Sequence, residues 1–540
     1  MHASPDSFSV RRRGFALLLV IVVLGFLVLI VVTLATHLRI EQAVALRRFQ
    51  VEQARRHALT GLSLAVGQLQ REAGSDRQSI AGAPMLGAVA ANKTHWVGVW
   101  GPDGNTPRWL VSSSDPDQPN PLSLAYAQPV TLVGSASAEV SAGATNDPDQ
   151  VRVDLIAVTV PAALVPGWSE AGDPVIGRTA YWVGDESGKL PALLRDERSA
   201  LVGEAPPNPW TALDLSALWG GFDLHATGVQ GALAKVVAYG QLGYVDSTAF
   251  SAARLRRNFH RVTVVSRSVL SNPAGGGLKQ EGQPDGSRAY GTAEAPRYDE
   301  QFYIRNPPTG TDPDHLPVAL FSVHRANGVV PPSAELSGPR ASARLLIAGG
   351  INLNTVSDDV TIQRERWRAI LSAARTVRFP SGEQRTLSSG ELDALASQLT
   401  ALRFRAAYPD VGKAAFAPFG GVGQFARSGL LQAAIDATMI NQGRTALSPD
   451  RIDQADLLAT LAPILLVRSD TFLVRAYGEA RDPFRAESLG EAWCEAVVQR
   501  LPDYVDPADD PWAAPVSVDN ELLGRRFVVT SFRWLTAADL

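Results

Sequence analysis

Residues 15–36 read FALLLVIVVLGFLVLIVVTLAT and contain no charged side chain. A helix of these 22 residues would be about 33 Å long at ~1.5 Å per residue, which matches a hydrocarbon core of about 30 Å. Arg11, Arg12 and Arg13 come directly before it, and basic residues favour the cytoplasmic side of a membrane. The sequence therefore predicts a single-pass protein of the cell inner membrane, with a cytoplasmic N-terminus and a periplasmic or extracellular C-terminal head.

The remainder of the chain has the composition of a folded protein. The whole chain has 540 residues, of which 45% are hydrophobic and 19% charged, enough for roughly two to four domains with sizeable cores. The net charge of −4 gives no general attraction for a phosphate backbone, so we expect no nucleic-acid partner. The single cysteine, Cys494, excludes an intramolecular disulfide and a Cys-based zinc site.

Three kinds of N-terminus fit an apolar stretch in this position. A cleaved secretory signal would have a shorter apolar region and a small-x-small site, and the best candidate, Thr33-Leu34-Ala35, is poor. An uncleaved signal anchor is the simplest alternative. The third is a prepilin-type leader, which ends at Gly14 and leaves the apolar segment as the first half of a long helix.

The residues beyond Thr36 favour the third kind. Residues 37–70 contain no proline, and apolar side chains recur there at helical spacing, namely at Ile40, Val44, Val51, Ala54, Ala58, Leu62 and Val66. A continuous helix from Phe15 to about Arg71 would be roughly 85 Å long. Its first half fits lipid, and its second half can pack on a globular head, for which a plain membrane anchor has no need.

The stretch RRRG-FALLLVIVV, residues 11–23, resembles the class III leader and first helix of type IV pilin-like proteins. The resemblance implies that a prepilin peptidase cuts after Gly14 and that Phe15 becomes the methylated first residue. Most such proteins carry Glu at the fifth mature position, where this chain has Leu19. GspK-like pseudopilins and PilX-like minor pilins usually lack that Glu, so the resemblance is to these groups of minor subunits.

Shorter stretches are similar to GspK-like proteins or to large, little-characterised pilin-like proteins: 54–59 (ARRHAL), 181–186 (YWVGDE), 185–189 (DESGK), 351–355 (INLNT), 466–470 (LVRSD), 494–506 (CEAVVQRLPDYVD) and 532–535 (FRWL). The likeness is best over the first 70 residues or so, moderate over 345–540 and weak between them. It implies an α+β fold with a long N-terminal transmembrane and spine helix, a pilin-like antiparallel β head and an inserted α-helical domain. It also implies other minor pilin or pseudopilin subunits as partners.

The composition along the chain agrees with that order of segments. We expect a leader (1–14), a transmembrane and spine helix (15–72), a β-rich head region (73–270), a flexible loop (271–300), a β segment (301–350), a helical inserted domain (351–465) and a C-terminal β segment (466–540). Within the helical domain, the pattern predicts helices over 358–376, from Ser388 to about Phe404, over 424–440 and from Pro449 to Pro463. The second of these opens on the capping box Ser388-Ser-Gly-Glu391.

No residue pattern predicts an enzyme. Residues 421–426 mimic a dinucleotide-binding glycine motif without the surrounding βαβ unit, and Cys494 has no local base to lower its pKa. Asp185, Glu186 and Lys189 could perform acid–base chemistry, although a turn after a strand explains them more simply. Asp-rich loops could take Ca²⁺, for which the sequence assigns no ligand, and we expect no other cofactor.

The sequence therefore predicts a non-enzymatic minor pilin-like or pseudopilin-like structural subunit. Leu19 and the bulk of the head favour a place at the tip or initiation complex of a type II secretion or type IV pilus-like apparatus. The alternative is a signal-anchored envelope protein whose exported head binds a ligand or catalyses a reaction.

Overall fold

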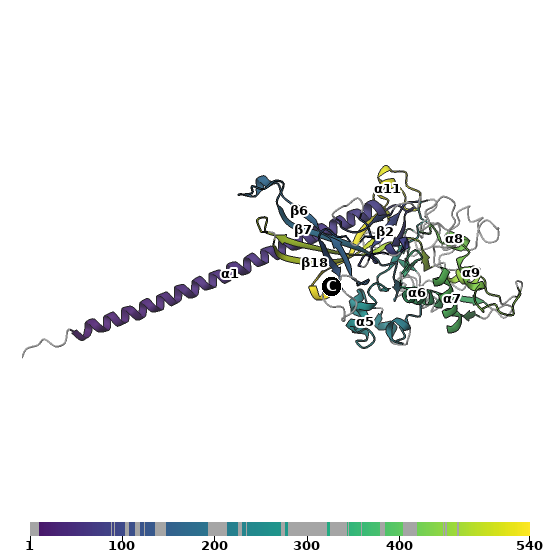
Figure 1. Cartoon of the computed structure of the whole chain (residues 1–540), viewed down its shortest axis with the longest axis horizontal. Helices are drawn as coiled ribbons and strands as arrows, with labels where there is room; N and C mark the ends of the chain where they lie inside the picture. Colours follow the sequence, from purple (N-terminus) through teal and green to yellow (C-terminus); the bar gives the residue numbers. More distant parts are fainter. Residues whose placement is uncertain are drawn as a thin grey trace, which may run out of the picture.

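The computed structural model is a mixed α+β protein in which one long helix projects from a head (Figure 1). It describes residues 10–87, 89–90, 92–102, 107–113, 119–123, 125–134, 147–192, 213–224, 229–233, 235–271, 276–278, 321–323, 343, 345–357, 359–377, 384–402, 418–445, 448, 451–461, 464–485 and 487–540. Residues 1–9 of the predicted leader (1–14), and residues 272–275 and 279–300 of the predicted loop (271–300), lie outside the described residues.

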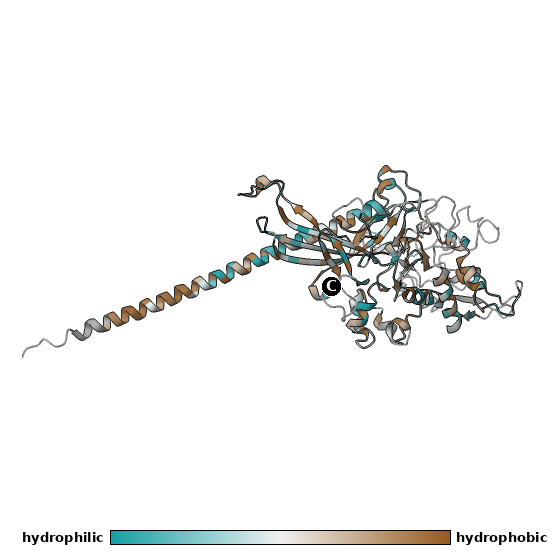
Figure 2. Ribbon diagram, viewed as in Figure 1, coloured by the Kyte–Doolittle hydropathy of each residue, from teal (hydrophilic) through white to brown (hydrophobic). Residues whose placement is uncertain are grey.

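Helix α1 (Val10–Ala73) is continuous over 64 residues, as the absence of proline predicts. From Phe15 to Phe49 its large apolar side chains are exposed, and the hydrophobic half of the helix stands clear of the head (Figure 2). A helix of this length and composition fits a single-pass membrane anchor or a signal sequence. The head begins where the apolar exposure ends.

A five-stranded antiparallel sheet carries the second half of α1. Its order is β19-β18-β17-β7-β6, with bounds β6 (Ile156–Thr159), β7 (Val175–Asp185), β17 (Thr471–Arg481), β18 (Ser488–Tyr504) and β19 (Arg525–Leu535). Ala58, Leu62 and Leu69 of α1 share a core with one face of this sheet. On the opposite face, Trp182 and Leu473 pack with residues from the first third of the chain.

Smaller sheets complete the β part. Two of them have three strands: β1 (Ser79–Gly82), β2 (Val97–Trp100) and β3 (Arg108–Trp109) in one, and β10 (Arg267–Val269), β12 (Leu345–Ala348) and β11 (Phe321–Val323) in the other. The others are pairs: β4 (Pro129–Val133) with β5 (Val151–Asp154), β14 (Arg375–Val377) with β15 (Gln384–Thr386), and the parallel pairs β8 (Leu190–Pro191) with β9 (Val262–Thr263) and β13 (Ile351–Asn352) with β16 (Leu465–Leu466).

The longest excursion of the chain lies between two neighbouring strands of the main sheet. β7 pairs with β17 in an antiparallel register that runs from Asp185 opposite Phe472 to Gly177 opposite Ala480, although 285 residues separate Asp185 from Thr471. Buried apolar residues between Leu190 and Val467 form a core of their own. The excursion is therefore packed as an insertion, with helices α3 (Val229–Leu233), α4 (Leu242–Val245), α5 (Ala252–Arg257), α6 (Val360–Ser372), α7 (Ser389–Leu402), α8 (Val422–Arg427), α9 (Leu430–Asp436) and α10 (Gln454–Leu461).

The described elements differ from the expected ones in four places. The range 73–270, expected to be β-rich, contains strands as far as β8, then the helices α3, α4 and α5, and then β9 and β10; the three helices pack in the same core as the later helices. The single helix expected over 424–440 is wrong, because Gly429 adopts a left-handed φ of 71° between α8 and α9. The helix expected from Pro449 begins at Gln454 instead, and α11 (Val518–Leu523), between β18 and β19, was not predicted.

Candidate functional site

The residues that the sequence singles out for processing and topology lie in the first turns of α1. The helix begins at Val10, so Arg11–Arg13 and Gly14 continue it rather than forming a separate segment before it. Phe15 is 71% exposed and Leu19 is 52% exposed. The side chains of Phe15 and Leu19 are therefore open to lipid or to another chain.

The second half of α1 lies unusually close to the sheet because glycines line the contact. A Cβ atom on Gly61 of α1 would lie 2.4 Å from Thr179 Oγ1 and 2.9 Å from the Ala180 carbonyl oxygen. On the sheet side, a Cβ on Gly478 would meet the backbone of Ala54 and Ala58. From sequence alone Gly61 only weakens a helix, whereas in the fold it permits this close approach.

Three buried arginines hold the C-terminal end of α1. Arg468 donates to the carbonyl oxygens of Ala73 and Ser75, at 2.8 and 2.6 Å. Arg500 donates to the carbonyl of Gly74 at 2.8 Å, as does the backbone N–H of Arg525 at 3.0 Å. The last carbonyls of a helix have no partner within it and carry its negative dipole end. The arginines satisfy these carbonyls and fix the helix to the sheet.

Two carboxylates complete this cluster, which we call the arginine lock (Asp76, Arg468, Asp470, Arg500 and Arg525). Arg525 donates to both carboxylate oxygens of Asp76, and Arg500 donates to Asp76 and, at 3.0 Å, to Asp470. Burial alone would raise the pKa of Asp76, but Arg525 and Arg500 hold that pKa well below its usual range. Asp76 is therefore ionised whenever the protein is folded at ordinary pH.

A second buried polar cluster forms where the insertion leaves and rejoins the sheet. It brings together three of the quoted stretches, 185–189, 351–355 and 466–470. Asn352 donates its backbone N–H to the Ser187 carbonyl at 2.7 Å and its side-chain amide to Ser469 Oγ at 3.0 Å. Asn354 donates to the carbonyl of Val467 at 2.9 Å. We call these residues, with Asp185, the insertion joint.

Asp185 is the titratable group of the insertion joint. Burial raises its pKa to about 6, against the hydrogen bonds from Ser469 and the Gly188 N–H that lower it. The neighbouring Glu186 and Lys189 form a buried ion pair, and Thr263 donates its hydroxyl to Glu186. Of the three residues that the sequence offered for acid–base chemistry, Glu186 and Lys189 thus link the turn after β7 to β9 through Thr263, and Asp185 links it to Asn352 and Ser469.

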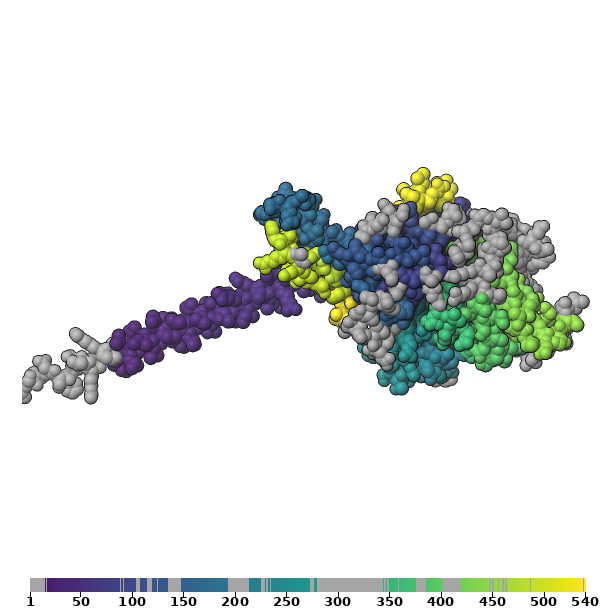
Figure 3. Space-filling view, viewed as in Figure 1, coloured from purple at the N-terminus to yellow at the C-terminus, as the bar shows by residue number. Residues whose placement is uncertain are grey.

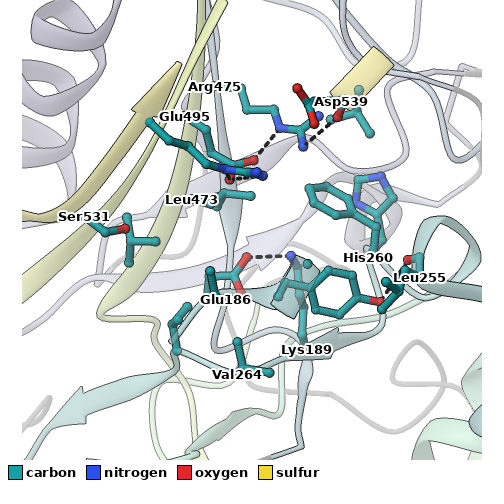
Figure 4. Close-up of a pocket in the computed structure, with 18 of the residues that line it drawn as sticks. Glu186, Lys189, Leu255, His260, Val264, Leu473, Arg475, Glu495, Ser531 and Asp539 are labelled. Atoms are coloured by element: carbon teal, nitrogen blue, oxygen red, sulfur yellow. Dashed lines mark hydrogen bonds and ion pairs between the residues drawn. The ribbon is translucent and has the colours of Figure 1, made fainter. Parts of the chain in front are cut away.

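A cavity of about 710 Å³ lies between the sheet face away from α1 and residues 237–267 of the insertion. Figure 4 shows its lining, with Arg475 and Glu495 of the sheet on one side and His260 on the other. Arg475 donates to Glu495 at 2.8 Å, and Glu495 also accepts from Arg533. Burial lowers the pKa of His260 well below its usual value. The cavity is large enough for a small ligand, and these charged side chains already have partners.

Cys494 and the Asp-rich loops are the remaining candidates from the sequence. Cys494 is buried in β18, where burial raises its pKa to about 12, so the thiol is packed as the sequence analysis favoured. The described residues contain no group of three or more His, Cys, Asp or Glu side chains placed to hold a metal ion. Among the Asp-rich loops, Asp506 and Asp509 accept hydrogen bonds from Ser517 and Asn520. Calcium binding stays an untested prediction.

The arginine lock was missed by sequence reasoning. Its members come from residues 76, 468–470, 500 and 525, and nothing in their local patterns connects them.

Comparison of the chain with family models, with curated proteins and with solved structures finds no match. The function of the chain must therefore be argued from helix α1, the arginine lock, the insertion joint and the cavity.

Proposed function

We propose that this chain is a minor pilin-like or pseudopilin-like structural subunit, anchored in the inner membrane with its head outside. The observation that carries the proposal is α1 itself: one unbroken helix is apolar and exposed over its first half and locked onto an antiparallel sheet over its second. The first half is suited to lipid and to the matching helices of other subunits. The lock makes the helix and the sheet a single mechanical unit.

The insertion between β7 and β17 supports the GspK-like character of the subunit. That group carries an α-helical domain inserted in a pilin-like head, and this chain has helices with their own core between two paired strands. The insertion makes the head bulky, and a bulky head is easier to place at the end of a filament than along it. We therefore place the chain at the tip or in the initiation complex of a type II secretion or type IV pilus-like apparatus, without an enzymatic role.

Processing is the first test of this proposal. The prepilin peptidase would cut after Gly14 and leave Phe15 as a methylated first residue. Mass spectrometry of the mature chain from membrane fractions reads this residue directly. A chain that begins at Met1 would contradict the proposal and favour a plain anchor, and a chain that begins after Ala35 would mean a released protein.

Leu19 supplies a second test. In pilin-like subunits the usual Glu at this position is thought to neutralise the free amine of a neighbouring subunit, and a tip subunit has no further amine to pair with. Leu19→Glu should therefore leave assembly nearly unchanged, as measured by co-purification with other pilin-like subunits. Strong loss of assembly, or abundant wild-type copies along a filament shaft, would contradict a tip position.

The cavity favours one other candidate function, a signal-anchored envelope protein whose head binds a ligand. Its volume of about 710 Å³ is typical of small-molecule sites, and its walls combine Phe259 and Leu473 with the Arg475–Glu495 pair. An unprocessed chain that stays monomeric in detergent would favour this second function over the first.

A further inference from the structure

Two hairpin ends of the main sheet project toward the membrane-spanning half of α1. One is the tip between β6 and β7, residues 160–174, and the other is the turn between β17 and β18, described over residues 482–485 and 487. Figure 3 shows both at the end of the head from which α1 emerges. They meet through Trp168 and Phe484, whose ring centroids are 6.0 Å apart.

This end of the head exposes apolar side chains, and hydrogen bonds within the β6–β7 tip hold the loop that carries one of them. Leu164 is 72% exposed and Phe484 is 58% exposed. The tip that carries Leu164 is closed by a hydrogen bond from the Ala162 N–H to Asp173 Oδ1 at 3.0 Å, and Trp168 Nε1 donates to the Gly172 carbonyl at 2.9 Å. The two loops thus present the exposed Leu164 and Phe484 beside the half-buried ring of Trp168, and leucine and aromatic side chains of this kind are found at membrane interfaces.

The register of α1 places this surface near the bilayer. Gly490, at the beginning of β18, lies against Gln50 of α1, which is 14 residues beyond Thr36, or about 21 Å along the helix. Both hairpin ends run back along α1 toward its exposed apolar half (Figure 1). The interfacial layer outside the hydrocarbon core occupies about 5–7 Å on each side, and membrane helices tilt by about 20° on average. Tilt toward the hairpins lowers them toward the lipid headgroups.

We propose that the head has a second membrane contact, in which Leu164, Trp168 and Phe484 insert into the interfacial layer of the leaflet from which α1 emerges. The arginine lock makes this contact effective, because a helix fixed to the sheet must tilt together with it. The contact sets the angle of the head above the membrane. It requires only that α1 spans the bilayer and is independent of cleavage at Gly14.

The single buried cysteine allows a clean test on the full chain. Cys494 is fully buried and its pKa is raised, so the wild-type protein is the blank for thiol labelling. Leu164→Cys is labelled with an environment-sensitive dye, and the protein is reconstituted into vesicles of phosphatidylcholine with a minority of phosphatidylglycerol. Tyr244→Cys, at a position in α4 that is 91% exposed, is the matched control in the insertion.

The dye at position 164 should emit at shorter wavelength than at position 244 and be quenched several-fold more by nitroxide-labelled lipid. Aqueous iodide should quench it several-fold less. Adding Phe484→Asp should move the dye at 164 back toward the control values. Equal behaviour of the two positions would overturn the proposal, and so would shielding from iodide without quenching by the lipid, which would indicate contact with another protein chain.

Discussion

Two buried polar clusters join the main sheet to other described parts of the chain, and each contains a buried carboxylate in a different electrostatic setting. At the arginine lock, Asp76 is surrounded by Arg525, Arg500 and Arg468, and its pKa is held well below the usual range. At the insertion joint, Asp185 is buried among amides and hydroxyls, with Arg366 as a weaker influence, and its pKa rises to about 6.

The difference shows how burial and charge compete. Burial raises the pKa of both carboxyl groups, and only a cluster of cations reverses that effect. The arginine lock, which holds α1, is therefore ionised and insensitive to pH near neutrality. The joint that holds the insertion carries a proton-dependent group. The two joints should respond differently to mutation and to pH.

The largest effect should come from Asp76→Asn. This change removes the carboxylate that Arg525 binds and leaves Arg500 with Asp470 as its acidic partner, and removing one partner of a buried ion pair costs about 3–5 kcal/mol. We expect a loss of this size in the free energy of unfolding in detergent, together with faster tryptic cleavage at the exposed Arg77 beside the end of α1. Glu170→Gln, at an exposed loop position, is the control and should change neither quantity. A normal midpoint and a normal cleavage rate for Asp76→Asn would mean that the lock does not hold the helix.

The second prediction concerns Asp185 and pH. Its carboxyl pKa rises from 3.8 to about 6 on folding, so between those values the folded protein keeps a proton that the unfolded chain releases. The free energy of unfolding should therefore fall as the pH rises from about 4 to about 6, by up to about 3 kcal/mol, and then level off. Asp76 has the opposite effect, because folding lowers its pKa. Its contribution to the free energy of unfolding is complete above the ordinary pKa of 3.8 and is lost as the pH falls through and below that value.

Asp185→Asn should remove that slope, because an amide does not titrate. The measurement is denaturant unfolding of both proteins across this pH range, in the same detergent. If the two curves run parallel, Asp185 is not the group that makes the insertion joint sensitive to pH.

The parts that the sequence predicted are those governed by local pattern. The length of α1 follows from the run of apolar residues and the absence of proline, and the capping box is confirmed, since Ser388 N–H donates to Glu391 Oε2 at 2.8 Å as α7 begins. The buried face of α1, expected from apolar side chains at helical spacing over residues 37–70, was predicted less well. Ala54, Ala58 and Leu62 are buried as expected, whereas Ile40 and Val44 are exposed below the head.

The parts that could not be predicted depend on distant contacts. Arg525 meets Asp76 across 449 positions of sequence, and neither residue differs locally from a surface charge. The break at Gly429 and the late start of α10 at Gln454 depend on packing within the insertion core. Propensity predicted one helix over 424–440 because a single glycine costs a helix only about 1 kcal/mol, which tertiary packing overrides.

The smallest effects should come from alanine substitutions at two glycines of α1. One glycine lies on the face that packs on the sheet and the other on the exposed face, so the two variants compare these faces. Gly61→Ala places a Cβ against Thr179 and the Ala180 carbonyl, so α1 must move from the sheet at a cost of about 1–3 kcal/mol. Gly67→Ala meets no atom within 4 Å and should instead stabilise by about 0.5–1 kcal/mol, because alanine favours the helix. Thermal unfolding of both variants should show shifts of opposite sign. Equal shifts would mean that helix propensity alone decides both sites and that the close approach of α1 to the sheet contributes nothing.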